Sequence, residues 1–133
     1  MVLFVLIAAL MNCNHSSKYH SGGPYYYSSF ADYSIPFKPI DELTENEAKI
    51  RKVYYMAYFD DKGKILSFIK YFNGKMEFSS SFSYRSDESL EKQEITNVEG
   101  KRINYFLNEF MFKSEIFDLK GQKTIKHFNN DKK

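Results

Sequence analysis

Residues on which catalysis, metal binding and cross-linking depend are scarce in this chain. Its 133 residues include one cysteine, three histidines and no tryptophan. A single cysteine excludes a disulfide within the chain. The sequence also lacks a G-x-S-x-G elbow, an H-E-x-x-H helix, a P-loop and an EF-hand loop. We therefore predict no catalytic residue, no cofactor and no metal site, and we expect that the protein is not an enzyme.

An excess of charge of either sign is also missing. Lysine and arginine total 19, aspartate and glutamate total 17, and the formal net charge is +2. Basic and acidic residues alternate through most of the chain, so no basic stripe is present to follow a phosphate backbone. We therefore expect no nucleic-acid partner, and we interpret the lysines near the C-terminus as a solvated face.

One long hydrophobic run is present, at residues 2–10 (VLFVLIAAL). It is too short to span a bilayer, which takes about 20 residues, and it has the length of the hydrophobic part of a signal peptide. Cys13 follows it, and Leu10-Met11-Asn12-Cys13 resembles a bacterial lipobox. The resemblance implies a signal peptide over 1–12, a lipid on Cys13 and membrane anchoring at the bacterial cell envelope. The alternative is an apolar N-terminal strand followed by a buried or free cysteine.

A polar segment, residues 13–24, follows the apolar run. Its serine and glycine content favours a flexible tether between the lipidated cysteine and the folded domain. His15 and His20 lie in this segment without a Cys, Asp or Glu at the spacing of metal ligands, so we interpret both as solvated. His127, near the C-terminus, is interpreted as a surface residue of a strand.

Turn signals divide residues 53–128 into short strands. Asn73-Gly74 is the clearest, because a type I′ turn needs positive φ at both central residues. Asp60 begins a turn that Gly63 can close, and this turn chemistry explains Asp60 and Asp61 without catalysis. Breaks recur about every 10–14 residues, at 60–63, 73–74, 85–88, 97–100, 108–109 and 118–121. The spacing predicts a mainly β fold (α+β), an antiparallel meander of about six to seven strands.

Two of these turns share a longer pattern. An aromatic residue is followed by Asp, two further residues, Gly, and then Lys or Gln, at 59–64 and again at 117–122. The pattern resembles the bacterial hairpin repeats of the YD and MORN-like type. Such families include structural, surface and antitoxin-like proteins, so the resemblance implies an architecture and carries over no functional residue.

One short helix is predicted near 45–52. Thr44 and Glu47 have the spacing of a capping box, in which each side chain binds the backbone amide of the other residue. Leu43 is placed to pack against Ala48. Acidic residues gather at the start of this segment and basic residues at its end, which suits the helix dipole.

The strands differ in how many of their faces are apolar. Residues 76–84 alternate, which predicts one buried and one wet face. Residues 64–72 are apolar on both faces, with Ile65, Ile69 and Tyr71 on one and Leu66, Phe68 and Phe72 on the other. We expect the helix and the aromatic segment before it to cover these two faces.

Aromatic residues are abundant, with 11 Tyr and 13 Phe. Tyr25, Tyr26 and Tyr27 follow one another, and Tyr55 lies in the first central strand. We interpret these tyrosines as hydrophobic cover of the sheet. The alternative is that they form a ligand-contact surface on which a glycan or a small apolar ligand stacks.

The predicted organisation has four parts. A signal peptide (1–12) precedes the lipidated Cys13 and its tether (13–24), a single β-meander domain (25–128) and a disordered tail (129–133). The predicted function is a non-enzymatic structural or binding role in an envelope lipoprotein, with an envelope protein or a glycan as partner. A ligand-binding module and an immunity or antitoxin-like partner protein are the alternatives.

Overall fold

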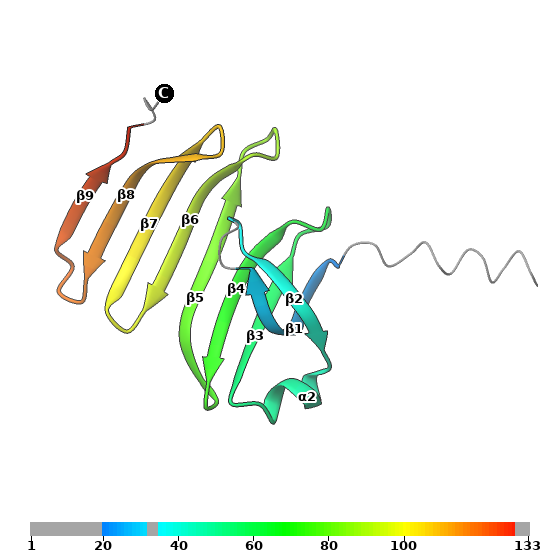
Figure 1. Cartoon of the computed structure of the whole chain (residues 1–133). Coiled ribbons are helices and arrows are strands. Elements are labelled where there is room, and N and C mark those ends of the chain that lie inside the picture. Colours follow the sequence, from blue (N-terminus) through cyan, green and yellow to red (C-terminus); the bar gives the residue numbers. More distant parts are fainter. Residues whose placement is uncertain (1–19, 32–34, 130–133) are drawn as a thin grey trace, which may run out of the picture.

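Nine antiparallel strands form one sheet in this computed structural model, which describes residues 20–31 and 35–129. Strand β1 lies between β2 and β3, and the remaining strands follow in chain order to β9. The elements are β1 (Gly22–Ala31), β2 (Lys38–Leu43), α2 (Glu45–Lys49), β3 (Val53–Phe59), β4 (Ile65–Phe72), β5 (Lys75–Tyr84), β6 (Leu90–Asn97), β7 (Gly100–Leu107), β8 (Phe110–Asp118) and β9 (Lys123–His127). Figure 1 shows them in this order.

The antiparallel meander is confirmed, but the strand number is nine rather than six to seven. The difference arises in the N-terminal aromatic segment, which forms a hairpin of two strands. Tyr27 of β1 pairs with Glu42 of β2 on one side and with Tyr55 of β3 on the other. Strand β1 begins at Gly22, so the last residues of the expected tether already belong to the sheet.

The predicted turns join successive strands. Asp60 Oδ1 accepts hydrogen bonds from the amides of Lys62 and Lys64 at 2.9 and 2.8 Å, and Asp118 repeats this arrangement with the amides two and four residues further on. Asn73 and Gly74 have φ values of 53° and 78°. Turn chemistry therefore explains these residues, as the sequence predicts.

A β-bulge at Leu66 places Ile65 of β4 on the other face of the sheet from the one predicted. Phe59 pairs with Ile65 and Tyr58 pairs with Ser67, which leaves Leu66 as the extra residue. Ile65 is therefore in the same core cluster as Phe68, and the prediction that they lie on opposite faces is wrong. An unbulged strand alternates strictly, and one extra residue shifts that alternation.

A second bulge interrupts β5. Tyr71 pairs with Met76 and Lys70 pairs with Phe78, so Glu77 is the extra residue. Met76 is 53% exposed, whereas Phe82 is buried. The expected alternation therefore holds from Phe78 onward and fails at Met76.

The main core consists of Tyr27, Tyr55, Ala57, Ile65, Phe68 and Phe82. Phe37, from the segment before β2, covers it, with its ring centroid 5.3 Å from that of Phe68 and 6.0 Å from that of Phe82. Phe30 of β1 packs beside Phe37 at 5.0 Å. The expectation that the aromatic segment covers one face of the central strands is confirmed.

The helix-side core, Tyr26, Ala48 and Tyr54, covers the opposite face. Thr44 Oγ1 accepts a hydrogen bond from the Glu47 amide at 3.1 Å, and Glu47 Oε1 accepts one from the Thr44 amide at 2.8 Å. The predicted capping box is therefore present, although α2 is shorter than the predicted 45–52. Leu43 packs against this core.

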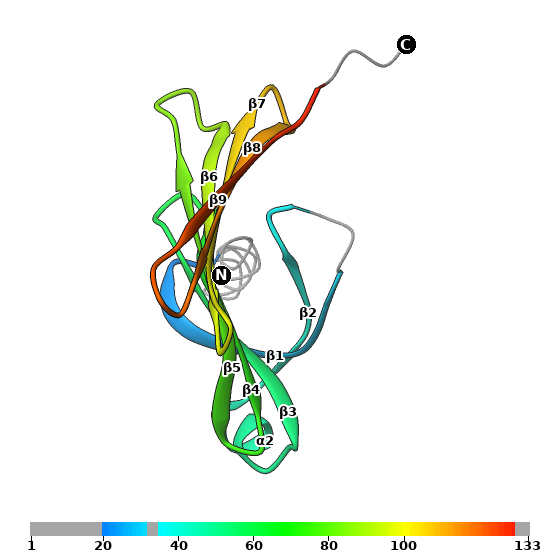
Figure 2. The same cartoon turned by 90° about the vertical axis from the view of Figure 1, so that its left-hand side faces the viewer.

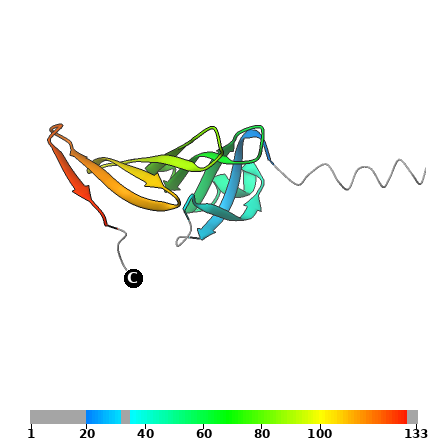
Figure 3. The same cartoon turned by 90° about the horizontal axis from the view of Figure 1, so that it is seen from above.

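Strands β6 to β9 continue the sheet as a single layer, which Figures 2 and 3 show from the side and from above. Their main contacts are with adjacent strands. Four polar side chains are nonetheless buried along the main-core face of β5 to β8, namely Ser80, Gln93, Asn104 and Ser114, and we call them the polar row. Within the described residues, no buried side-chain nitrogen or oxygen lacks a hydrogen-bond partner.

Candidate functional site: a cleft at the end of the sheet

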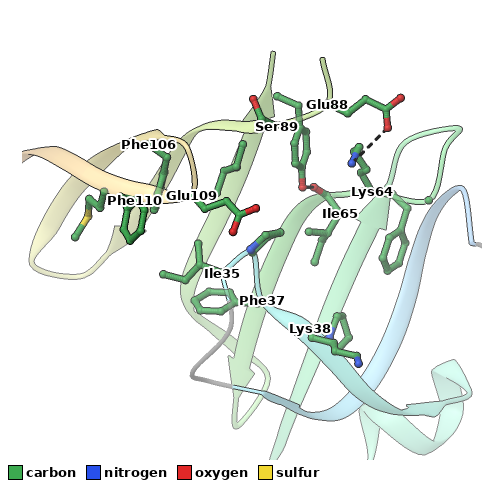
Figure 4. A pocket seen from close by; sticks show the side chains of 17 residues that line it. Ile35, Phe37, Lys38, Lys64, Ile65, Glu88, Ser89, Phe106, Glu109 and Phe110 are labelled. Carbon is green, nitrogen blue, oxygen red and sulfur yellow. Dashed lines mark hydrogen bonds and ion pairs between the residues drawn. The ribbon is translucent and has the colours of Figure 1, made fainter. Parts of the chain in front are cut away.

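A cleft of about 940 Å³ opens where three hairpin turns meet the segment before β2. Figure 4 shows its lining from close by. The volume lies within the range of small-molecule sites in proteins. Most of its large side chains are apolar, and the main apolar residues are Ile35, Phe37, Phe59, Ile65, Leu90, Phe106, Phe110 and Met111.

The floor of the cleft is continuous with the main core. Ile65 belongs to that core, and Tyr84 and Leu90 pack against it. The Tyr84 hydroxyl donates a hydrogen bond to the Ile65 carbonyl at 2.7 Å. Burial raises the pKa of Tyr84 to about 12, and the negative charge of Asp60 acts in the same direction. Tyr84 therefore stays neutral and supplies an amphipathic floor.

One rim carries a compact ion-pair group. Glu88 Oε2 lies 3.2 Å from Lys62 Nζ, and Glu88 Oε1 lies 3.5 Å from Lys64 Nζ. The hydrogen bond from Lys62, helped by the charges of both lysines, lowers the pKa of Glu88. Lys64 Nζ also lies 5.3 Å from the ring centroid of Tyr84. These contacts join the β3–β4 turn to the β5–β6 turn.

Arg85 fixes the β5–β6 turn against the next hairpin. Its Nη1 donates to the Leu90 carbonyl at 3.0 Å, and its Nη2 donates to the Phe106 carbonyl at 2.6 Å. A half-buried guanidinium shared between two strands holds both in one geometry. The wall of the cleft that contains Phe106 is therefore preformed.

The opposite rim is the β7–β8 turn. Asn108 and Glu109 have φ values of 51° and 69°, so this turn has positive φ at both central residues without a glycine. Phe110 follows and is 56% exposed at the edge of the cleft. Among the described residues, none forms a hydrogen bond or ion pair with the Glu109 carboxylate.

A smaller hollow of about 340 Å³ lies at the opposite end of the sheet, beside the β6–β7 turn. Charged residues, among them Lys101, Arg102 and Asp118, surround it. Its apolar surface is small, and it is the weaker candidate for a ligand site.

The four tyrosines considered as ligand contacts do not form a common surface. Tyr27 and Tyr55 are in the main core, whereas Tyr26 is in the helix-side core on the other face. Tyr25 stacks on His20 with ring centroids 3.9 Å apart. None of the four lines the cleft. Successive residues of a strand point to opposite faces, which separates Tyr26 from its neighbours.

The histidines have structural positions. His20 Nε2 lies 2.7 Å from Glu42 Oε1, so His20 is tied to β2 rather than solvated in a tether. His127 is exposed on β9, as predicted. Cys13 and His15 lie outside the described residues. Within residues 20–31 and 35–129, no cluster of three or more Asp, Glu, His or Cys side chains has the arrangement of a metal site.

Sequence reasoning missed the cleft itself. Ile35 and Phe37 come from the aromatic segment, whereas Phe106 and Phe110 come from a hairpin about 70 residues later. The pairing of the eight strands from β2 to β8 in the sheet brings them together. The one local signal is the apolar Phe110-Met111 pair directly after a polar turn. In the described part of the chain, no helix has the length and apolar character needed to cross a membrane.

Comparisons with known proteins identify the family without a function. No curated protein and no solved structure matches the chain. A family model described as a family of unknown function (DUF6156) matches residues 18–110. The matched region runs from just before β1 to the start of β8. It contains all the residues that line the cleft except Met111. Because the match covers more than half of the sequence, this chain belongs to the DUF6156 family.

Proposed function

We propose that the protein is a membrane-anchored binding protein of the bacterial cell envelope, with a non-enzymatic role, and that it holds a small amphiphilic ligand in the cleft. The observation that carries the proposal is the cleft itself. About 940 Å³ of space is lined by apolar side chains from four separate parts of the chain, 35–39, 59–65, 84–90 and 106–111, and is rimmed by charge. This combination of an apolar body and few polar groups is typical of sites for small ligands.

The rigidity of the walls supports binding. Arg85 and the Glu88 ion pairs hold three turns around the cleft in the described structure. A preformed site avoids the cost of ordering its walls when the ligand enters. The proposed contact residues are therefore Ile35, Phe37, Phe106 and Phe110, in place of the tyrosines at 25–27 and 55.

Membrane anchoring rests on the sequence alone. The apolar run at residues 2–10 and the lipobox-like sequence ending at Cys13 support it. A lipid on Cys13 would keep the domain close to the membrane, where amphiphilic molecules concentrate.

Binding is tested with decanol, a neutral amphiphile, on the purified full-length chain. At a hundredfold excess over its Kd, a ligand stabilises the native state by about 2.7 kcal/mol, so the melting temperature is expected to rise by several degrees. Phe110→Ala, at the exposed edge of the cleft, should weaken this shift. Leu107→Ala is the matched control, because Leu107 is similarly exposed at 53% and does not line the cleft. An equal loss in both variants, or no shift in the wild type, contradicts the proposal.

Anchoring is tested by incorporation of radiolabelled palmitate in cells, together with membrane fractionation. We expect the wild type to take up label and to sediment with membranes, and Cys13→Ala to lose both properties. A wild-type chain that takes no label contradicts the anchoring part of the proposal and leaves the binding part to the decanol experiment.

A further inference from the structure

We infer that the ligand of the cleft carries a positive charge and that Glu109 is the residue that selects it. The inference rests on the proposed function, because it concerns the same cleft, and it adds the chemical class of the ligand. That class is an apolar chain or ring with one amine or quaternary ammonium group.

The first observation is the free carboxylate of Glu109. Glu88, the other acidic residue of the cleft, is neutralised by Lys62 and Lys64. Glu109 has no such partner among the described residues. Figure 4 shows its side chain pointing from the β7–β8 turn into the space that the lining residues enclose. One unneutralised negative charge therefore faces the cleft.

The second observation is the backbone at Glu109. Its φ is 69°, a left-handed conformation that costs an L-residue with a Cβ about 1 kcal/mol relative to glycine. The β4–β5 hairpin has the same turn geometry and places Gly74 at the corresponding position, with φ 78°. Residues held in such conformations gather at ligand sites, where the side chain has a use that offsets the strain.

The cations of the cleft do not compete for the same role. Lys64 is half-buried and is held by Glu88 and by the face of Tyr84. Lys38 lies on β2, and Figure 4 shows it pointing away from the centre of the cleft. An anionic ligand over the floor of the cleft would therefore find the Lys64 ammonium already paired, whereas a cationic ligand would find the free carboxylate of Glu109.

Aromatic rings beside Glu109 suit the same ligand. Phe106 and Phe110 line the cleft on either side of the turn that carries Glu109. The face of an aromatic ring attracts an ammonium group, and the attraction grows when the group is partly removed from water. Phe106 is 4% exposed and Phe110 is 56% exposed, so Phe110 supplies the accessible ring for a cationic head held by Glu109.

The experiment compares three probes with the same ten-carbon chain, decyltrimethylammonium, decanol and decanoate, each kept below its micelle concentration. Binding to the purified full-length chain is measured by calorimetry. We expect the wild type to bind the ammonium about fivefold more tightly than decanol, a preference typical of a partly exposed charge pair beside an aromatic ring, and to bind decanoate most weakly. Added salt should reduce the preference.

Three variants separate charge from structure. Glu109→Gln retains the turn and should bind the ammonium and decanol equally. Glu109→Gly should lose the same preference while the melting temperature rises, because the strain at this position is relieved. Glu99→Gln, in the β6–β7 turn at the other end of the sheet, is the matched control and should behave as the wild type.

The outcomes distinguish this inference from the proposal on which it rests. If the wild type binds all three probes equally, or binds decanoate most tightly, the selection of cations is overturned and the amphiphile-binding function stands. If no probe binds, both the selection of cations and the amphiphile-binding function are contradicted. If Glu99→Gln reduces the preference as much as Glu109→Gln does, the effect comes from the overall charge of the protein, and Glu109 is not the selecting residue.

Discussion

Asn104 Nδ2 donates a hydrogen bond to Gln93 Oε1 at 3.1 Å, across the paired strands β7 and β6. The same bonding continues to both sides, from Gln93 Nε2 to Ser80 Oγ at 3.2 Å and from Ser114 Oγ to Asn104 Oδ1 at 2.8 Å. The polar row thus links four strands through side chains as well as backbone. A slip of one residue in any of these pairings would break it, so the row specifies the register of the single-layer region.

We predict that Asn104→Ala lowers the free energy of unfolding by about 2 kcal/mol, because it leaves buried polar atoms of Gln93 and Ser114 without partners. Ser81→Ala is the control, since Ser81 is exposed on β5, and it should change stability by less than about 0.5 kcal/mol. Chemical denaturation monitored by circular dichroism measures both. Equal effects would show that the polar row contributes nothing specific.

We predict that Phe68→Ala costs about 3–5 kcal/mol, the usual range for removing a phenylalanine from a core. Phe68 is 0% exposed, stacks on Tyr55 with centroids 5.2 Å apart and meets Phe30 edge-on at 5.2 Å. Phe72 lies on the same strand and is 40% exposed. Phe72→Ala should therefore cost far less in the same denaturation experiment, and similar losses would contradict the placement of the main core.

Two glycines with positive φ offer a matched comparison. A Cβ at Gly100 would overlap the carbonyl oxygen of Phe117 on the neighbouring strand, whereas nothing lies within 4 Å of a Cβ at Gly121. We predict that Gly121→Ala costs about 1 kcal/mol from backbone conformation alone. Gly100→Ala should cost at least about 2 kcal/mol more, because β7 and β8 must also move apart. Melting temperatures of the two variants test this order.

The buried tyrosines give a prediction for alkaline pH. Burial raises the pKa values of Tyr27 and Tyr84 from 10.0 to about 12. Because the folded state disfavours the phenolate, the stabilisation is fully present below pH 10 and is lost as the pH rises through about 12. The free energy of unfolding should therefore fall over this interval. In Tyr84→Phe the fall should be shallower, and an unchanged slope would contradict the assignment.

How far sequence reasoning succeeded depended on whether the signal was local. The turns at Asp60 and Asn73 were predictable because a few side-chain and φ requirements define them. The capping box at Thr44 was predictable for the same reason. The face of the sheet on which Ile65 lies was not predictable, because the bulge at Leu66 depends on how β3 and β4 fit together. Met76 was misplaced by the bulge at Glu77 in the same way.

The candidate site was harder to foresee because its residues are distant in sequence. Tyr25, Tyr26 and Tyr27 formed the most conspicuous aromatic group, but strand alternation divides two of them between opposite cores. Glu109 has no distinguishing neighbours in the sequence. Its importance comes from the cleft beside it and from the absence of a counter-charge among the described residues, and both follow from tertiary structure.

The single layer formed by β6 to β9 gives the molecule graded stability. Each of these strands depends mainly on its two neighbours, as in a repeat protein, and the outermost strand depends on one. Opening should therefore proceed inward from β9, with amide-exchange protection rising strand by strand toward β5. The β7–β8 wall of the cleft stands partway along this gradient. The least stable strands thus lie beyond the cleft, toward β9, whereas the Arg85 contacts and the aromatic core hold the walls of the cleft itself.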